Sequence, residues 1–255
     1  MGGEGRAVYA GRERAPAGLG DGEGEAVGFD DACCNKGVGE ALGPRSNKDL
    51  MLPILDTPLA LTDDAQDLLF REARTANAFT DEPVSDEQVR AVYDLAKWGP
   101  TALNGQPLRV LLVRSDEARA RLLPHMSGGN VPKTAGAPLV AVLAYDADFH
   151  EQLPRVFPHA PQAKGWFEGD DKASARHQSA RDNAWLQAGY FIVGVRAAGL
   201  AAGPMSGFDA DGVDAEFFAD RSWRSFMVVN IGRPAEGAWK QRLPRLPYDD
   251  VVEEA

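Results

Sequence analysis

Three short apolar runs constrain most strongly what this chain can fold into, because they are rich in β-branched residues and flanked by structure-breaking residues. The runs are LRVLLVR at residues 108–114, PLVAVLAY at residues 138–145 and FMVVNIG at residues 226–232. A helix opening at Ser115 is expected between the first two. Helical patterns outnumber strands elsewhere, which predicts an α+β domain whose sheet has few strands and is wrapped by helices.

Two helices are expected ahead of the first strand. The first begins near Thr62, which is a capping candidate, and carries an apolar face at helical spacing. That face consists of Ala65, Leu68, Leu69 and Ala73. Ser85 and Gln88 form a capping box for the second helix, which the Gly-Pro pair at residues 99–100 brings to an end.

A third, long helix is expected over residues 172–198, with Gly199 in the position of a C-terminal capping glycine. One stripe of this helix combines small and apolar residues. Its members are Ala184, Ala188, Phe191, Val195 and Ala198. The stripe fits either the core of the domain or a contact between subunits, and periodicity alone favours the core.

The first 50 residues differ from the rest, because they hold 12 of the 27 glycines and show no sustained apolar period. Such a composition buries too little apolar surface to offset the entropy lost on ordering. We therefore expect a flexible, glycine-rich extension over residues 1–55 and one folded domain over residues 56–255. A hydrophobic content of 44% is sufficient for one sizeable core.

The charge balance argues against polyanionic partners. The chain has 38 acidic and 27 basic residues and a formal net charge of −11, so its field repels nucleic acid and anionic membranes. The adjacent Cys33 and Cys34 offer neither a disulfide framework nor a CxxC metal site, and no signal-peptide pattern opens the sequence. A soluble cytoplasmic protein is expected, in which local cationic clusters can still hold small anions.

Searches for catalytic patterns find no GxSxG, HExxH, Walker or strand-linked GxGxxG motif, so no catalytic acid, base or metal site is assigned. Five polar clusters beside structure-breaking residues remain. They are REART at residues 71–75, PTALNGQP at 100–107, GGNVPK at 128–133, GPMSGF at 203–208 and KQRLPR at 240–245. Each has a simple alternative: charges at a helix end, a turn with Asn104 in the left-handed region, or a solvated edge.

Taken together, these clusters resemble the FMN-dependent nitroreductase family, over roughly residues 68–250. Several stretches, among them KWGPTALNGQP and YDADFHEQLPRVFPH, are most similar to its malonic semialdehyde reductase branch, which belongs to uracil degradation. The resemblance implies a nitroreductase-like α+β fold with a central, mostly antiparallel sheet flanked by helices. It also implies an intertwined homodimer, in which residues of both chains line each of two flavin sites.

The resemblance further implies which residues contact FMN. The phosphate would be held by a segment of the first helix and by a second cluster near the C-terminus, although Asn77 stands where the family has a second arginine. These phosphate contacts are Arg74, Thr75, Asn77, Lys240 and Arg242. A family loop near the flavin corresponds to Pro100, Thr101, Asn104, Gln106 and Pro107, with Thr101 in place of serine.

Two more segments complete the implied site. Asn130 and Lys133 match a family pair that faces the pyrimidine edge of the flavin, where a cation stabilises the anionic reduced form. A backbone segment beside the flavin N5 atom is implied at Pro204, Met205, Ser206 and Gly207.

The implied reaction transfers hydride from NADH or NADPH to FMN and then two electrons to a second small molecule in the same pocket. That substrate would be malonic semialdehyde, which is reduced to 3-hydroxypropionate. The alternatives are a nitroaromatic or quinone reductase of broad specificity, an FMN-binding protein without reductase turnover, and a dimeric interaction protein without cofactor.

Overall fold

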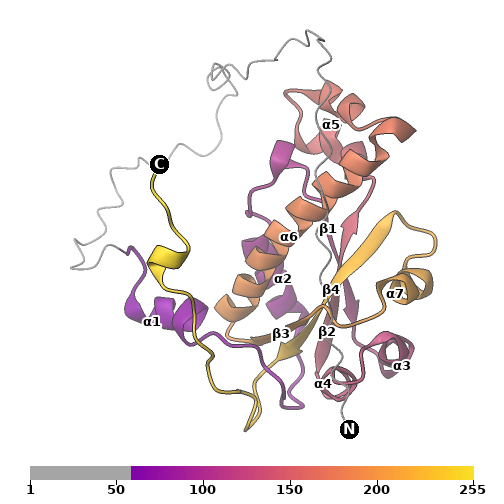
Figure 1. Ribbon diagram of the computed structural model, residues 1–255. Coiled ribbons are helices and arrows are strands. Elements are labelled where there is room, and N and C mark those ends of the chain that lie inside the picture. The colour runs from indigo at the N-terminus through magenta and orange to yellow at the C-terminus, as the bar shows by residue number, and fades with distance from the viewer. Residues whose placement is uncertain (1–58) are drawn as a thin grey trace, which may run out of the picture. The chain divides into compact units, whose positions relative to one another are not determined.

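A four-stranded antiparallel sheet lies at the centre of residues 59–255, which are the residues that the computed structural model describes (Figure 1). Its strands are β1 (Leu108–Val113), β2 (Leu139–Asp146), β3 (Ala201–Met205) and β4 (Trp223–Gly232). They follow the order β1-β2-β4-β3, and each neighbouring pair is antiparallel. The three predicted strands are confirmed. The predicted N-terminal extension over residues 1–55 lies outside the described residues.

Strand β2 is buried on both faces and pairs along both edges. Leu139, Ala141 and Leu143 belong to one apolar cluster, whereas the alternate residues Val140, Val142 and Ala144 belong to another. This alternation follows from the period of two in a strand. The two clusters are therefore cores on opposite faces of the sheet.

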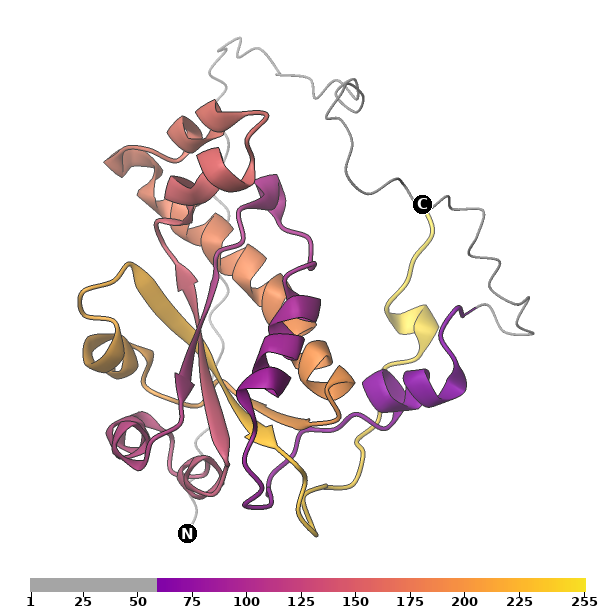
Figure 2. The same cartoon turned by 180° about the vertical axis from the view of Figure 1, so that it is seen from behind.

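Helices cover both faces of the sheet (Figures 1 and 2). On one face α2 (Asp86–Ala96) and α6 (Ala173–Ala197) pack against the first cluster, through residues such as Val92 and Val195. On the other face α3 (Asp116–Leu122), α4 (Val131–Ala135) and α7 (Ala210–Phe217) pack against the second. The shorter elements are α1 (Asp63–Gln66), η1 (Asp67–Arg71), η2 (Ala102–Asn104), η3 (Leu123–His125), η4 (Phe149–Gln152), α5 (Leu153–Val156), η5 (Pro161–Trp166), η6 (Asp170–Lys172) and η7 (Tyr248–Asp250).

Local signals in the sequence fix most helix ends. The Ser85 hydroxyl accepts from the Gln88 amide at 3.2 Å, and the Gln88 side chain accepts from the Ser85 amide at 2.9 Å, which completes the predicted capping box. Ser115 caps α3 as expected. Gly199, at a φ of 72°, ends α6. The small-residue stripe of α6 faces the first core cluster, so the interpretation as core is confirmed.

The first helix is shorter than its apolar pattern indicates. Thr62 caps α1 as predicted, but α1 continues into a π-helical turn, η1, and helical structure stops at Arg71. The prediction that Ala73 continues the helix is therefore wrong. The carbonyl oxygens of Arg71 and Ala73 instead accept hydrogen bonds from the guanidinium of Arg242, so they are satisfied without a further helical turn.

Strand β3 was not predicted, because its sequence AAGPM has a low intrinsic preference for strands. Pairing with β4 makes it a strand, and its place at the edge of the sheet tolerates Pro204. Within residues 59–255, none of the helices combines the length and the apolar character needed to span a bilayer.

Candidate functional site

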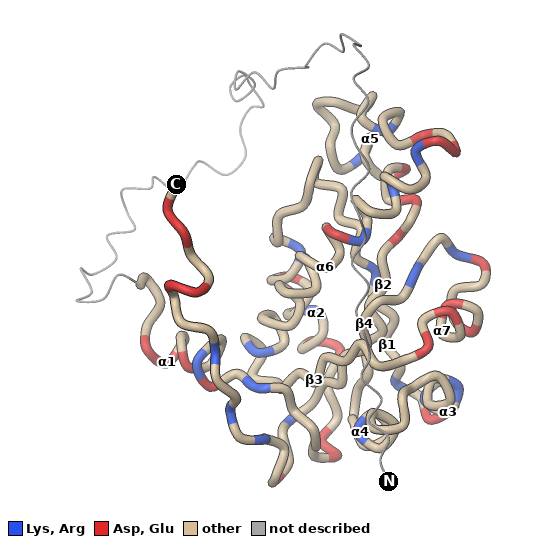
Figure 3. Tube along the Cα trace, in the orientation of Figure 1, with Lys and Arg blue, Asp and Glu red and all other residues tan. Residues whose placement is uncertain are grey.

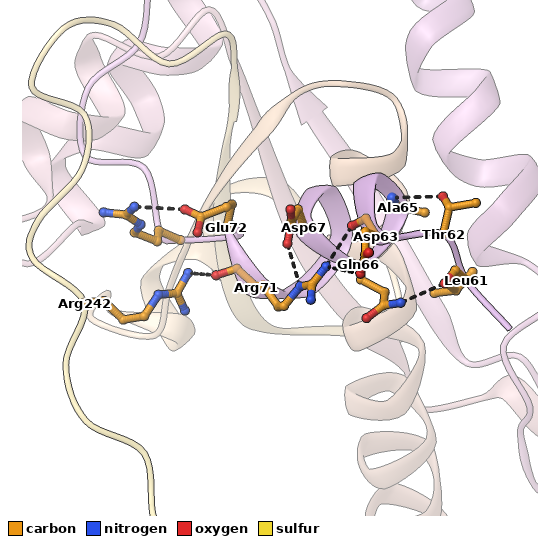
Figure 4. Close-up of polar contacts among 10 residues, drawn as sticks. Leu61, Thr62, Asp63, Ala65, Gln66, Asp67, Arg71, Glu72 and Arg242 are labelled. Carbon is orange, nitrogen blue, oxygen red and sulfur yellow. Dashed lines mark hydrogen bonds and ion pairs between the residues drawn. The ribbon is translucent and has the colours of Figure 1, made fainter. Parts of the chain in front are cut away.

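The C-terminal cationic cluster and the end of the first helix lie side by side, although about 170 residues separate them in sequence. The Arg242 guanidinium donates to the Ala73 carbonyl at 3.2 Å. It also donates to the Arg71 carbonyl, a contact that Figure 4 shows. Arg74 follows in an extended segment after the helix and forms an ion pair with Glu72 at 3.1 Å. Figure 3 shows the cationic residues on the C-terminal segment where it passes α1. The fold thus brings the two predicted phosphate-binding segments together.

Asn77 connects the same two segments through its backbone and side chain. Its amide N–H donates to the Ala238 carbonyl at 3.0 Å, and its side-chain nitrogen donates to the Thr75 carbonyl at 3.2 Å. The Asn77 side chain therefore serves to hold the chain around Arg74. Lys240, two residues after the buried Ala238, is exposed.

The segment over residues 74–77 packs directly on β3. The Ala76 amide donates to the Ala202 carbonyl at 3.0 Å. A Cβ atom on Gly203 would lie only 2.7 Å from the Ala76 carbonyl oxygen, so this approach requires glycine. Pro204 and Met205 continue in β3, whereas Ser206 and Gly207 follow its end.

Gly207 leads to the predicted pyrimidine-edge pair. Its carbonyl accepts hydrogen bonds from the Asn130 side chain at 2.9 Å and from the Ser127 amide at 3.1 Å. Asn130 precedes α4, and the partly buried Lys133 lies in the first turn of that helix. Residues 203–207 therefore contact the Ala76 segment at one end and Asn130 at the other. Four of the five predicted clusters form one contiguous region.

The fifth cluster, the loop over residues 100–107, lies at the other end of the sheet. It leads into Leu108, which pairs with Tyr145 of β2, and Tyr145 pairs with Arg224 at the start of β4. Gly203 pairs with Asn230, which lies six residues after Arg224 in β4. Six residues correspond to roughly 20 Å along a strand. In a single chain the loop therefore does not join the region around β3.

The loop makes its own contacts with the helices. The Asn104 side-chain nitrogen donates to the Val156 carbonyl at 2.8 Å, which ties the loop to α5. Asn104 adopts a φ of 50°, as expected for a turn residue in the left-handed region. Pro100 and Thr101 precede η2, and the Thr101 hydroxyl accepts from the Gln106 amide at 3.2 Å.

A cavity of about 610 Å³ opens beside this loop, between α2, β1, α5 and α6. Gln106 lines it, together with the cationic Lys97, Arg109 and Arg155, and its lining contains no aspartate or glutamate. Lys97 pairs with Asp94 and Arg109 pairs with Asp146, whereas no residue of the described chain forms an ion pair with Arg155. Sequence reasoning missed this cavity, because its lining comes from separate elements that share no motif.

Comparison with known proteins assigns the chain to a family. The model of the nitroreductase family matches residues 70–233. A "Putative NADH dehydrogenase/NAD(P)H nitroreductase" of Streptomyces griseus is 61% identical over 194 residues, which are 76% of this chain and 97% of the relative. A protein of the same name from Stenotrophomonas maltophilia is 49% identical over 193 residues, again 76% and 97% of the two chains. This chain belongs to the nitroreductase family and is an oxidoreductase.

A solved structure supports the same fold. The crystal structure of a "putative nitroreductase in complex with FMN" from Exiguobacterium sibiricum superimposes with a TM-score of 0.67 over 76% of this chain and 98% of that chain, at 22% identity. The predicted nitroreductase-like α+β fold is thereby confirmed.

Proposed function

We propose that this protein is an FMN-dependent oxidoreductase that takes hydride from NADH or NADPH and passes two electrons to a second small molecule. The main observation behind this proposal is that four clusters far apart in sequence lie in one region of the fold. They bring the cations Arg74, Lys133, Lys240 and Arg242 to that region in a chain whose net charge is −11. The NAD(P)H in the relatives' names and the FMN in the solved relative support the same assignment.

The donors around Arg74 suit a phosphate group. Arginine presents a planar fork that matches phosphate oxygens, and Thr75 adds a hydroxyl. The ion pair between Arg74 and Glu72 does not oppose this role, because Glu72 is exposed, Arg74 is only partly buried, and pairs near the surface contribute at most about 1 kcal/mol. A phosphate dianion can therefore replace Glu72. In this proposal Arg74, Thr75 and Arg242 together form a phosphate clamp. Arg242 already lies against Ala73, next to Arg74.

The other end of the region suits the flavin ring. Asn130 is oriented by its bond to Gly207, and Lys133 supplies a positive charge one turn away. When bound, FMN supplies the hydride chemistry, while Lys133 would favour negative charge on the reduced ring.

We infer that a second copy of the chain supplies the loop over residues 100–107, so that the active unit is an intertwined homodimer. Large apolar side chains are exposed on α2 and α6 and on the C-terminal segment, which indicates surfaces that a partner covers. They include Tyr93, Leu95, Trp98, Trp185, Leu186, Tyr190, Leu243, Leu246, Tyr248, Val251 and Val252. Two-fold symmetry would then create two equivalent sites.

For the acceptor we propose malonic semialdehyde, on the strength of the sequence resemblance. The acid-free lining of the cavity beside Gln106, with the unpaired Arg155, suits a small carboxylate. A nitroaromatic or quinone acceptor is the second candidate, because the relatives carry the name nitroreductase. Comparison of kcat/KM for malonic semialdehyde and for a nitroaromatic decides between them, and a strong preference for the nitro compound would refute the first.

The decisive experiment is anaerobic addition of NADH or NADPH to the purified protein while its flavin absorbance is recorded. Bleaching within seconds is expected, whereas a flavin that stays oxidised would identify an FMN-binding protein without turnover. In the phosphate clamp, Arg242→Gln should weaken FMN binding by about 10- to 100-fold, since a charge-assisted hydrogen bond contributes about 1.5–3 kcal/mol. Arg245→Gln is the matched control, because Arg245 donates only to the nearby carbonyls of Leu243 and Pro244.

A further inference from the structure

The loop between α2 and β1 has an unusual backbone. Among the described residues, the non-glycine residues with positive φ are Leu103 at 54°, Asn104 at 50° and Gln106 at 44°, and all three lie in this loop. Leucine is disfavoured there, because its Cβ comes too close to the following carbonyl oxygen. A backbone of this kind persists only where its surroundings hold it in place.

One helix holds both ends of this loop. The Ala102 amide donates to Asn183 Oδ1 at 2.7 Å, and the Leu108 amide donates to Gln187 Oε1 at 2.9 Å. Asn183 and Gln187 are four residues apart on α6 and therefore share a face. Asn183 is oriented in turn by donation from its side-chain nitrogen to the Ser179 carbonyl at 2.8 Å.

Packing fixes the middle of the loop and the turn before it. A Cβ atom on Gly105 would lie 2.9 Å from the ring of Phe149, and one on Gly99 would lie 2.9 Å from the ring of Tyr190. Phe149 is buried at 2% exposure, so its ring forms a rigid support. Together with the bond from Asn104 to Val156, these contacts determine the loop conformation from two sides.

We propose that Asn183 and Gln187 are positioning residues, which hold the strained loop in the conformation that contacts the flavin. This inference rests on the proposed function, in which the loop borders the cofactor of the other subunit. A loop that is already ordered loses no conformational entropy when the flavin binds, and it keeps the reacting groups oriented. Asn183 is the better residue to test, because Gln187 is also buried in the core, at 5% exposure.

The test uses the full-length protein reconstituted with FMN. Asn183→Leu removes the acceptor for the Ala102 amide, Asn183→Ser removes it with a smaller change in volume, and Asn183→Asp retains an acceptor oxygen. Asp182→Asn is the matched control, since Asp182 is the exposed neighbour on α6 and accepts only from Gln178. Three quantities are measured: hydrogen exchange of the Ala102 amide in the FMN-free protein, and the visible circular dichroism and the reduction rate per bound flavin in the reconstituted protein.

In Asn183→Leu and Asn183→Ser, the Ala102 amide should exchange at least about 10-fold faster, and the flavin reduction rate should fall by a similar factor. The control should stay within about 3-fold of the wild type, and Asn183→Asp should lie between the control and the disruptive variants, because it keeps an acceptor for the Ala102 amide but loses the bond to the Ser179 carbonyl. Per-flavin rates and dichroism that remain unchanged in both disruptive variants would overturn the inference, even if the melting temperature falls. A wild-type protein that takes up no FMN would instead overturn the proposed function, and the exchange measurement distinguishes the two failures.

Discussion

Replacing Gly203 with alanine tests the close packing of residues 74–77 on β3. The new Cβ would lie 2.7 Å from the Ala76 carbonyl oxygen, which is several tenths of an ångström closer than ordinary contact distance. Neither group can move aside easily, because Gly203 pairs with Asn230 in the sheet and the Ala76 amide is bonded to Ala202. Overpacking of this kind costs about 1–3 kcal/mol.

The expected result is a clear loss of stability with a loss of flavin affinity. For a domain of this size, 2 kcal/mol lowers the melting temperature by about 4–8 °C. Displacement of Ala76 also moves Arg74 and Thr75, so FMN should stabilise the Gly203→Ala variant less than the wild type. Thermal unfolding with and without FMN measures both effects. Gly165→Ala is the control, because a Cβ there meets only the Glu168 carboxylate, at an ordinary contact distance of 3.8 Å, and Gly165 lies outside the candidate site. A Gly203→Ala protein that melts with the wild type would refute the reasoning.

Three further changes test the scaffold. Ser85→Ala removes one half of the capping box and should lower the free energy of unfolding by about 1 kcal/mol in a urea titration, whereas Ser85→Thr should retain most of it. Leu143→Ala leaves a cavity in a fully buried position and should cost about 2–5 kcal/mol in the same assay; a cost under 1 kcal/mol would contradict the assigned core. Burial, and secondly the charge of Arg176, lower the pKa of His150 in the folded protein. As the pH falls below about 6.5, the imidazole of His150 is therefore protonated in the unfolded chain before it is protonated in the folded one. The free energy of unfolding should therefore decrease on acidification, and His150 should account for at most about 1.4 kcal/mol of that decrease per pH unit. The variant His150→Gln should lack this part of the decrease.

The elements that the sequence predicts well are those with a local cause. The capping box at Ser85 and the glycine at position 199 act within one turn of their helix, and the apolar runs of β1, β2 and β4 show their burial directly. Strand β3 and the end of the first helix have causes far away in sequence. Pairing with β4 makes β3 a strand, and the guanidinium of Arg242 contributes to ending the first helix. Composition in a short window cannot reveal either cause.

The candidate site divides in the same way. Resemblance to a family identified the clusters at Arg74, Asn130, Gly207 and Arg242, and the fold brings their segments together. It could not tell that the loop containing Asn104 lies at the opposite end of the sheet, because pairing between strands that are far apart in sequence determines that position. The supporting role of Asn183 was also hidden, since an asparagine within a helix has no distinctive spacing.

The burial of β2 on both faces has a consequence for how the sheet finds its alignment. In most strands a slip of one residue would expose the apolar side to water, but in β2 it would only exchange one apolar face for the other. Hydrophobicity alone therefore cannot select the correct pairing. Asp146 at the end of the strand can, because its carboxylate accepts from Arg109 at 2.7 Å and from the Ser222 hydroxyl at 2.6 Å. A misaligned β2 would leave this buried charge without its partners, so the carboxylate favours the observed alignment of β2 with its neighbours β1 and β4.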